Sequence, residues 1–166
     1  MAEDRHATIA NAEMIRNTPL GEELSESQCD ALADKVNVIH LDKGDFLIEE
    51  GKTDDSLFVI ISGQIEVLVR SNDGKTVTLH ILKEGNLAGE LGFLDNHPHS
   101  AGLRALDSAT VISLSRKDFE SFIQADPDLM YKVMRSIMRT VHAILFDMNQ
   151  SHVEMNNYIY KQHGRY

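Results

Sequence analysis

Apolar and polar residues alternate through the middle of the chain, from about residue 36 to residue 115. A period of two is typical of strands that bury one face and expose the other. Glycine, asparagine and aspartate interrupt the alternation at short intervals, and Asn72-Asp73-Gly74 has the composition of a tight hairpin turn. The pattern predicts strands at about residues 36–41, 45–50, 56–62, 64–71, 75–82, 100–105 and 109–114.

Helices are predicted on both sides of these strands. Two short ones precede them, at about residues 9–17 and residues 26–37. Ser25 is the expected N-cap of the second helix, and Gln28 occupies the capping-box position three residues later. After the strands, Ser115 begins another helix.

The longest helix is predicted from Asp126-Pro127, an N-cap followed by proline in the first turn, to about Lys161. It carries an apolar stripe with a heptad repeat. The a positions are Met134, Val141, Met148 and Met155, the d positions are Met130, Ile137, Ile144, Ser151 and Tyr158, and the e positions are Met138, Leu145, His152 and Ile159. A helix of this length extends beyond one small sheet domain. We therefore expect one flank of this helix to pack on the protein's own domain and the other flank to form a parallel homodimer through residues 130–159. The alternative is a helix that packs only on its own domain.

Residues Gly85 to Leu94, followed by Pro98 to Ala101, form a candidate phosphate-binding turn. Glycines let the backbone approach an anion, and a short helix beginning at Glu90 offers free N–H groups at its first turn. The carboxylate of Glu90 would repel a phosphate, so it is better suited to accept a hydrogen bond from a neighbouring hydroxyl such as a ribose 2′-OH.

This turn, together with glycine corners at Gly44, Gly51 and Gly63, resembles the cyclic nucleotide-binding domains of bacterial catabolite activator proteins and protein kinase A regulatory subunits. The resemblance covers about residues 20–160. It implies a mainly β fold with flanking helices: a β-roll, or double-stranded β-helix, and a long C-terminal dimerisation helix. The expected parts are an N-terminal helical segment at 1–35, a roll at 36–115 with its phosphate-binding cassette at 85–101, and C-terminal helices at 116–166.

The resemblance also implies a site for a cyclic nucleotide, cyclic AMP or cyclic GMP. Glu90 would bind the ribose hydroxyl, the N–H groups around Leu91 and Ala101 would hold the phosphate with Ser100, and the purine would contact the long helix near Thr140. The expected ligand-binding residues are Gly89, Glu90, Leu91, His99, Ser100, Ala101, His80 and Thr140.

One position departs from the family. His99 occupies the place where these domains usually carry an arginine against the cyclic phosphate. Arginine is always charged and binds two phosphate oxygens at once, whereas a neutral histidine offers one donor. Two functions therefore remain open. The first is a free-standing nucleotide sensor that signals to an unidentified protein partner; a cyclic dinucleotide is another candidate for its ligand. The second is a degenerate roll that has lost its ligand and serves as a protein-interaction scaffold.

Charge and composition exclude several other functions. The net charge is −10, and the residues from Asp126 onward hold five Lys or Arg against four Asp or Glu, so residues 1–125 carry −11. Such a surface repels nucleic acid, and no helix-turn-helix pattern follows the long helix, so no DNA binding is expected. No apolar run reaches the ~18 residues of a membrane span. The single Cys29 points to a reducing cytoplasm.

Neither catalysis nor a cofactor is expected. No nucleophile elbow and no pair of carboxylates in a glycine-rich cleft is present. His97-Pro98-His99 matches the HxH element of metal-binding cupins, but those sites need a glutamate a few residues downstream and Ala101 to Ala105 contains none. The prediction is a binding protein without metal.

Overall fold

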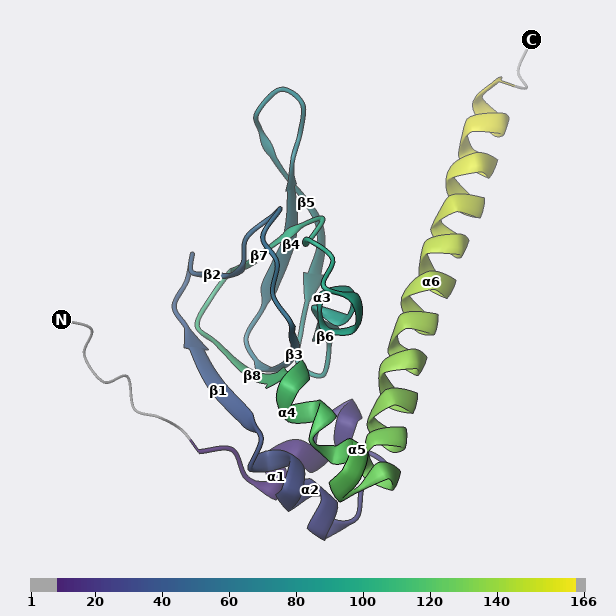
Figure 1. Cartoon of the computed structure of the whole chain (residues 1–166). Coiled ribbons are helices and arrows are strands. Elements are labelled where there is room, and N and C mark those ends of the chain that lie inside the picture. Colours follow the sequence, from purple (N-terminus) through teal and green to yellow (C-terminus); the bar gives the residue numbers. More distant parts are fainter. Residues whose placement is uncertain (1–8, 164–166) are drawn as a thin grey trace, which may run out of the picture.

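Two antiparallel four-stranded sheets form a roll (Figure 1). The computed structural model describes residues 9–163, and the side chains of Met148, His152 and residues 159–163 lie outside that description. In spatial order, one sheet holds β1 (Val36–Leu41), β8 (Ala109–Ser115), β3 (Ser56–Ser62) and β6 (Leu87–Ala88), and the other holds β2 (Phe46–Ile48), β7 (Gly102–Ala105), β4 (Ile65–Arg70) and β5 (Thr76–Leu82). The expected mainly β fold with flanking helices is confirmed.

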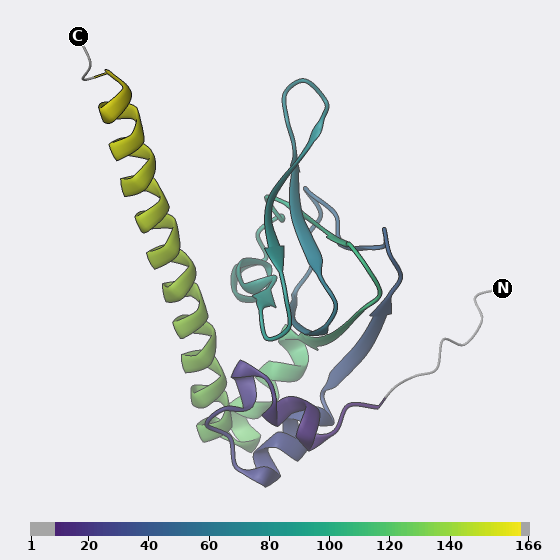
Figure 2. The ribbon, with the colours of Figure 1, turned by 180° about the vertical axis from the view of Figure 1, so that it is seen from behind.

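All the short helices except the one at Glu90–Asp95 gather at one end of the roll, and the long helix passes along its side (Figures 1 and 2). The helical elements are α1 (Ala12–Arg16), the 3₁₀ turn η1 (Pro19–Gly21), α2 (Glu26–Ala33), α3 (Glu90–Asp95), α4 (Arg116–Glu120), α5 (Phe122–Ala125) and α6 (Pro127–His163). The expected caps of α2 and α6 are present: the Ser25 hydroxyl accepts from the Gln28 amide, and Asp126 accepts from the Leu129 amide. Among the described residues, no helix combines the length and apolarity needed to cross a bilayer.

The prediction of a helix over residues 26–37 is wrong in its last turn. Helix α2 ends at Ala33 with Asp34 as C-cap, and Val36 already pairs with Leu114 of β8. Pairing with a neighbouring strand therefore overrides the local helical pattern. The strands expected at 45–50 and 100–105 are shorter than predicted, and the two-residue strand β6 was not predicted.

Strands β3 and β8 are buried on both faces, and their side chains alternate between two cores. Leu57 and Val59 pack with the helices, while Phe58 and Ile60 pack inside the roll. The helical core also takes Leu129, Val133 and Ile137, the fully buried face of the first half of α6. The helices and the roll are thus joined through the same two strands.

Polar contacts fix the first turns of α6 to the N-terminal helices. Gln28 donates to Asp128 at 3.0 Å, and Lys132 reaches both residues at 3.2 and 2.6 Å. Hydrogen bonds from Lys132 and then Gln28 lower the pKa of Asp128. Arg135 and Arg139 both pair with Glu23, beside the start of α2. These contacts set where α6 leaves the domain.

Glu66 on β4 is the only acidic residue buried inside the described part of the two sheets. The Arg104 guanidinium, directly across on β7, lies 2.6 Å from its carboxylate, and the Thr78 hydroxyl donates to it at 2.7 Å. The Thr78 hydrogen bond, followed by that of Arg104, lowers the pKa of Glu66 below 4.5. The ionised carboxylate therefore stabilises the fold.

We expect Glu66→Gln to lower the free energy of unfolding at pH 7 by about 1.5–3 kcal/mol, the range for hydrogen bonds to charged groups. Because the folded pKa of Glu66 is lowered, its contribution is complete above its unfolded pKa, near 4.5, and is lost as the pH falls through the folded value. Urea titrations between pH 7 and pH 3 should show that the difference in unfolding free energy between the unmodified protein and Glu66→Gln becomes smaller as the pH falls. Glu49→Gln, at an exposed carboxylate, is the control. An equal difference in unfolding free energy at every pH would contradict a stabilising role for the ionised Glu66 carboxylate.

Candidate functional site

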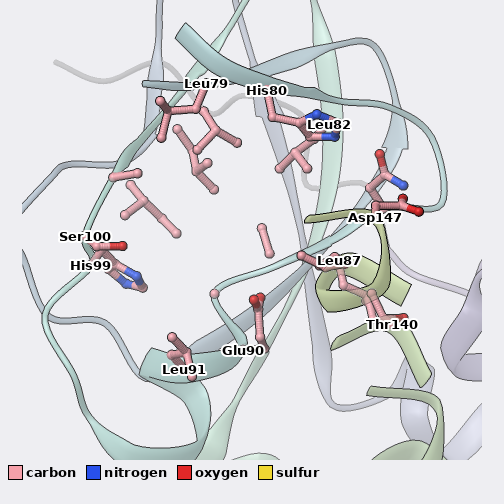
Figure 3. A pocket seen from close by; sticks show the side chains of 18 of the residues that line it. Leu79, His80, Leu82, Leu87, Glu90, Leu91, His99, Ser100, Thr140 and Asp147 are labelled. Carbon is pink, nitrogen blue, oxygen red and sulfur yellow. The ribbon is translucent and has the colours of Figure 1, made fainter. Parts of the chain in front are cut away.

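One pocket of about 850 Å³ lies between the roll, α3 and α6 (Figure 3). All eight residues expected at the ligand site line it: Gly89, Glu90, Leu91, His99, Ser100, Ala101, His80 and Thr140. Leu91, His99 and Ser100 lie on one side and Thr140 and Asp147 on the other. The structure thus brings the predicted residues together, while their contacts with a ligand stay a prediction.

The cassette begins where β6 turns into α3. Gly89 has φ +83° and is the N-cap residue of α3, which starts at Glu90 as expected. A Cβ at Gly89 would lie 2.6 Å from the Ser56 carbonyl oxygen and 3.0 Å from the Phe58 ring. Only glycine meets both conditions, because it accepts a left-handed backbone and has no side chain. The tight turn places the first residues of α3, Glu90 and Leu91, in the wall of the pocket.

The C-terminal end of α3 is held by Arg116, the first residue of α4. Its Nε donates to the Phe93 carbonyl at 2.6 Å, and its Nη2 donates to the Gly92 carbonyl at 2.7 Å. The Phe93 ring also packs on Phe119 of α4, with 5.3 Å between centroids. The cassette helix is therefore fastened to the segment that leads into α6. Sequence reasoning missed Arg116, because nothing local marks a side chain that caps a helix 24 residues away.

Glu90 points its carboxylate into the pocket (Figure 3). Its side chain is half-buried, and among the residues that the structure describes it has no hydrogen-bond or ion-pair partner. The carboxylate can therefore accept hydrogen bonds from hydroxyl or amino groups of a ligand.

His99 is held in place by its backbone. Its amide donates to the Lys52 carbonyl at 2.9 Å, and its carbonyl accepts from the Gly51 amide at 2.8 Å. The ring lies on α3, where a Cβ at Gly92 would be 2.8 Å from Cε1. Nε2 is buried and has no hydrogen-bond partner within the described chain. One of the two ring nitrogens thus lies against the helix, which leaves at most the other for a ligand.

Helix α6 contributes more of the pocket than was predicted. Besides Thr140, its lining residues are Ala143, Ile144, Asp147, Ser151 and Met155. Ile144, Ser151 and Met155 are a or d positions of the expected dimer seam, and Ile137 is buried in the protein's own core. Much of the a/d stripe therefore faces its own domain. A heptad repeat shows that a helix face is apolar, and it does not show which neighbour covers that face. Met148, His152 and Ile159, also assigned to the stripe, lie outside the described side chains.

The exposed apolar residues of α6 lie mostly at other positions of the repeat. Met138 and Leu145, both e positions, are 55% and 54% exposed, and Phe146 is 55% exposed. At the a and d positions, Ile144, Met155 and Tyr158 are 42%, 60% and 65% exposed. These side chains are available to a second molecule.

The charges of the pocket are unbalanced. Within residues 9–163, whose described side chains form the lining, it includes the carboxylates of Glu90 and Asp147 and no lysine or arginine. Three histidines also line it: His80, His97 and His99. Nε2 of His97 lies 2.9 Å from the Asp95 carboxylate. No group of three potential metal ligands is present among the described residues.

Comparisons with known proteins agree with this geometry. The pattern that defines the cyclic nucleotide-binding domain matches residues 38–126, more than half of the chain. A solved cyclic nucleotide-binding domain from Methylobacillus flagellatus superposes with a TM-score of 0.77 at 20% identity, covering 87% of this chain and 81% of that one. A mutant regulatory subunit of a cAMP-independent protein kinase A from Trypanosoma brucei, bound to cAMP in its A site, gives 0.68 at 26% identity, covering 85% and 49%.

The curated relatives are much longer proteins. Neuropathy target esterase sws from Drosophila melanogaster is 28% identical over 142 residues, which cover 81% of this chain and 10% of the esterase. The chain therefore spans about a tenth of the length of the relatives it matches, and its likeness concerns one domain of them.

Gly89→Ala tests the geometry of the cassette turn. Alanine there adds backbone strain at positive φ and a collision with the Ser56 carbonyl, so we expect a loss of unfolding free energy of about 2–4 kcal/mol. Gly85→Ala is the matched control, because Gly85 has φ +82° but open space around its Cβ position. It should cost about 1 kcal/mol. Equal losses in chemical denaturation would show that Gly89 is under no steric constraint.

Proposed function

Because the chain belongs to the cyclic nucleotide-binding domain family, we propose that it is a regulatory module rather than an enzyme. The module binds cyclic AMP, cyclic GMP or a related purine ribonucleotide. Helix α6 transmits this binding to a protein partner. The observation that carries this proposal is the carboxylate of Glu90, which has no partner in the described part of the chain and points into a pocket bounded by the cassette and α6. A half-buried carboxylate without a protein partner suits a ligand that brings hydroxyl donors.

Each part of the pocket has a proposed role. Glu90 accepts from the ribose hydroxyls. The amides of Leu91 and Ala101, with the Ser100 hydroxyl, receive the phosphate, and His99 approaches it as the substitute for arginine. Thr140 and Asp147 face the purine from α6, and His80 lies at the same side of the roll.

Helix α6 is the proposed output. A ligand shifts a conformational equilibrium only by binding one state better than the other. A purine held by the cassette and touched by Thr140 makes more contacts when α6 lies close to the roll, so binding favours that position. The first turns of α6 stay fixed by Glu23 and Gln28, and the movement then appears in the distal half.

The alternative is a roll without a ligand that acts as a protein-interaction scaffold. His99 in place of arginine favours it, because a cyclic phosphate then lacks its charged partner. The Trypanosoma brucei regulatory subunit belongs to a cAMP-independent kinase, although its mutant form binds cAMP in the A site, so similar domains differ in their dependence on cyclic AMP.

A homodimer through residues 130–159 is part of the proposal. The exposed side chains of Met138, Leu145 and Phe146 support it, since a row of large apolar residues on a soluble helix is stabilised by a second helix.

A thermal-shift panel of cyclic mononucleotides and cyclic dinucleotides tests the binding function. A ligand at a hundredfold excess over Kd should stabilise the protein by about 2.7 kcal/mol. Glu90→Ala should reduce the shift at fixed ligand concentration, because the ribose loses its acceptor, whereas Glu84→Ala, outside this pocket, should leave it unchanged. If no ligand stabilises either the unmodified protein or His99→Arg, the scaffold function replaces the sensor.

Met138→Lys combined with Leu145→Lys tests the dimer. Lysines at these exposed positions place like charges between paired helices without entering the protein's own core, so light scattering should report monomers. Met134 and Val141 are unsuitable, because they pack partly on the helical core. Val77→Lys with Ile81→Lys, at exposed apolar residues of β5, is the control and should stay dimeric. An unmodified protein that is already monomeric would contradict the seam.

A further inference from the structure

The described lining of the pocket offers an anion no fixed positive charge. It combines two carboxylates, Glu90 and Asp147, with hydroxyl groups, three imidazoles and apolar side chains, and no lysine or arginine is among these residues. A neutral imidazole donates one hydrogen bond and carries no net charge. The permanent charges that face a ligand here are therefore negative.

The arginines around the pocket are engaged elsewhere. Arg104 pairs with Glu66, Arg116 caps α3, and Arg135 pairs with Glu23. None of the three lines the pocket, and moving any of them into it would break the contact that it makes in the fold.

His99 compensates poorly for the missing arginine. Nε2 is buried on Gly92 without a partner, so the ring has one nitrogen left for the pocket. A cyclic monophosphate carries a full negative charge. A cyclic monophosphate bound here would place that charge near Glu90. Residues 1–125, which include Glu90, already carry a net charge of −11. Like charges close together in a partly dry site repel strongly.

The same groups suit a neutral ligand that is rich in hydrogen-bond donors. The two hydroxyls of a free ribose can donate to Glu90, and the amino group of a purine can donate to Asp147 on the α6 side. Leu82, Leu87 and Leu103 provide an apolar surface for the flat base. A volume of about 850 Å³ is ample for such a molecule.

From this charge balance we infer that the preferred ligand is a neutral purine ribonucleoside, bound in preference to the corresponding cyclic monophosphate at neutral pH. The inference rests on the proposed function, because it keeps the same pocket and the same regulatory role and replaces the cyclic monophosphate by its nucleoside as the preferred ligand. It goes further in one respect: the phosphate subsite of the cassette is left without a charged partner, and the ribose and the base carry the binding.

Isothermal titration calorimetry with adenosine, guanosine, cyclic AMP and cyclic GMP at pH 7.5 tests it. At least one nucleoside should bind about 10- to 100-fold tighter than its cyclic monophosphate, the factor that corresponds to one missing charge-assisted hydrogen bond. His99→Arg should reverse the order of affinities, because it should tighten the binding of the cyclic monophosphate by a similar factor. The affinity for the nucleoside should change by less than about threefold. Glu90→Gln should weaken the binding of the nucleoside and reduce the difference in affinity between the nucleoside and its cyclic monophosphate, because it removes the negative charge while keeping an acceptor.

His40→Arg is the matched control. It adds the same charge on β1, outside the pocket, and should leave the order of affinities unchanged. A cyclic monophosphate that binds the unmodified protein as tightly as its nucleoside overturns the inference and leaves the proposed function standing. Absence of binding by all four compounds, to the unmodified protein and to His99→Arg, overturns both.

Discussion

The burial of β3 and β8 on both faces is the constraint on which the rest of the molecule depends. Each strand divides its side chains between the interior of the roll and the core beneath the helices. Neither core can be rebuilt without disturbing the other, because consecutive residues of one strand serve different sides. The cassette, which packs on β3, and α6, whose buried face joins the helical core, therefore share one rigid reference, and the pocket between them has a defined shape.

Much of this could be predicted from the sequence, and the physical reason differs from one element to another. Gly89 and Glu90 identified the cassette because a turn at positive φ admits almost only glycine, which leaves a mark at a fixed position in the chain. The caps at Ser25 and Asp126 were predictable because their partners lie three residues away. The end of α2 was placed about one turn too late, although the strand from Val36 was predicted, because the strand partner Leu114 lies far along the chain.

The candidate site shows the same division. The residues that carry the family motif were found, whereas Asp147, Ser151 and Met155 were not, because their place in the pocket depends on the direction in which α6 leaves the domain. That direction is set by contacts between Glu23, Gln28 and the first turns of α6, which pair residues about a hundred positions apart. An apolar stripe on a helix reveals that something covers it, and only the assembled fold reveals what.

The guanidinium of Arg116 has a consequence for how such a module would report occupancy. It binds the last carbonyls of α3 and belongs to α4, so the cassette helix and the segment before α6 move together. The wall formed by Thr140 and Asp147 is a second, separate route to the same helix. A compound that satisfies Glu90 but is too short to touch α6 would use the first route alone. Affinity and response are then distinct properties of a ligand, and a tight binder of this kind would act as a partial agonist.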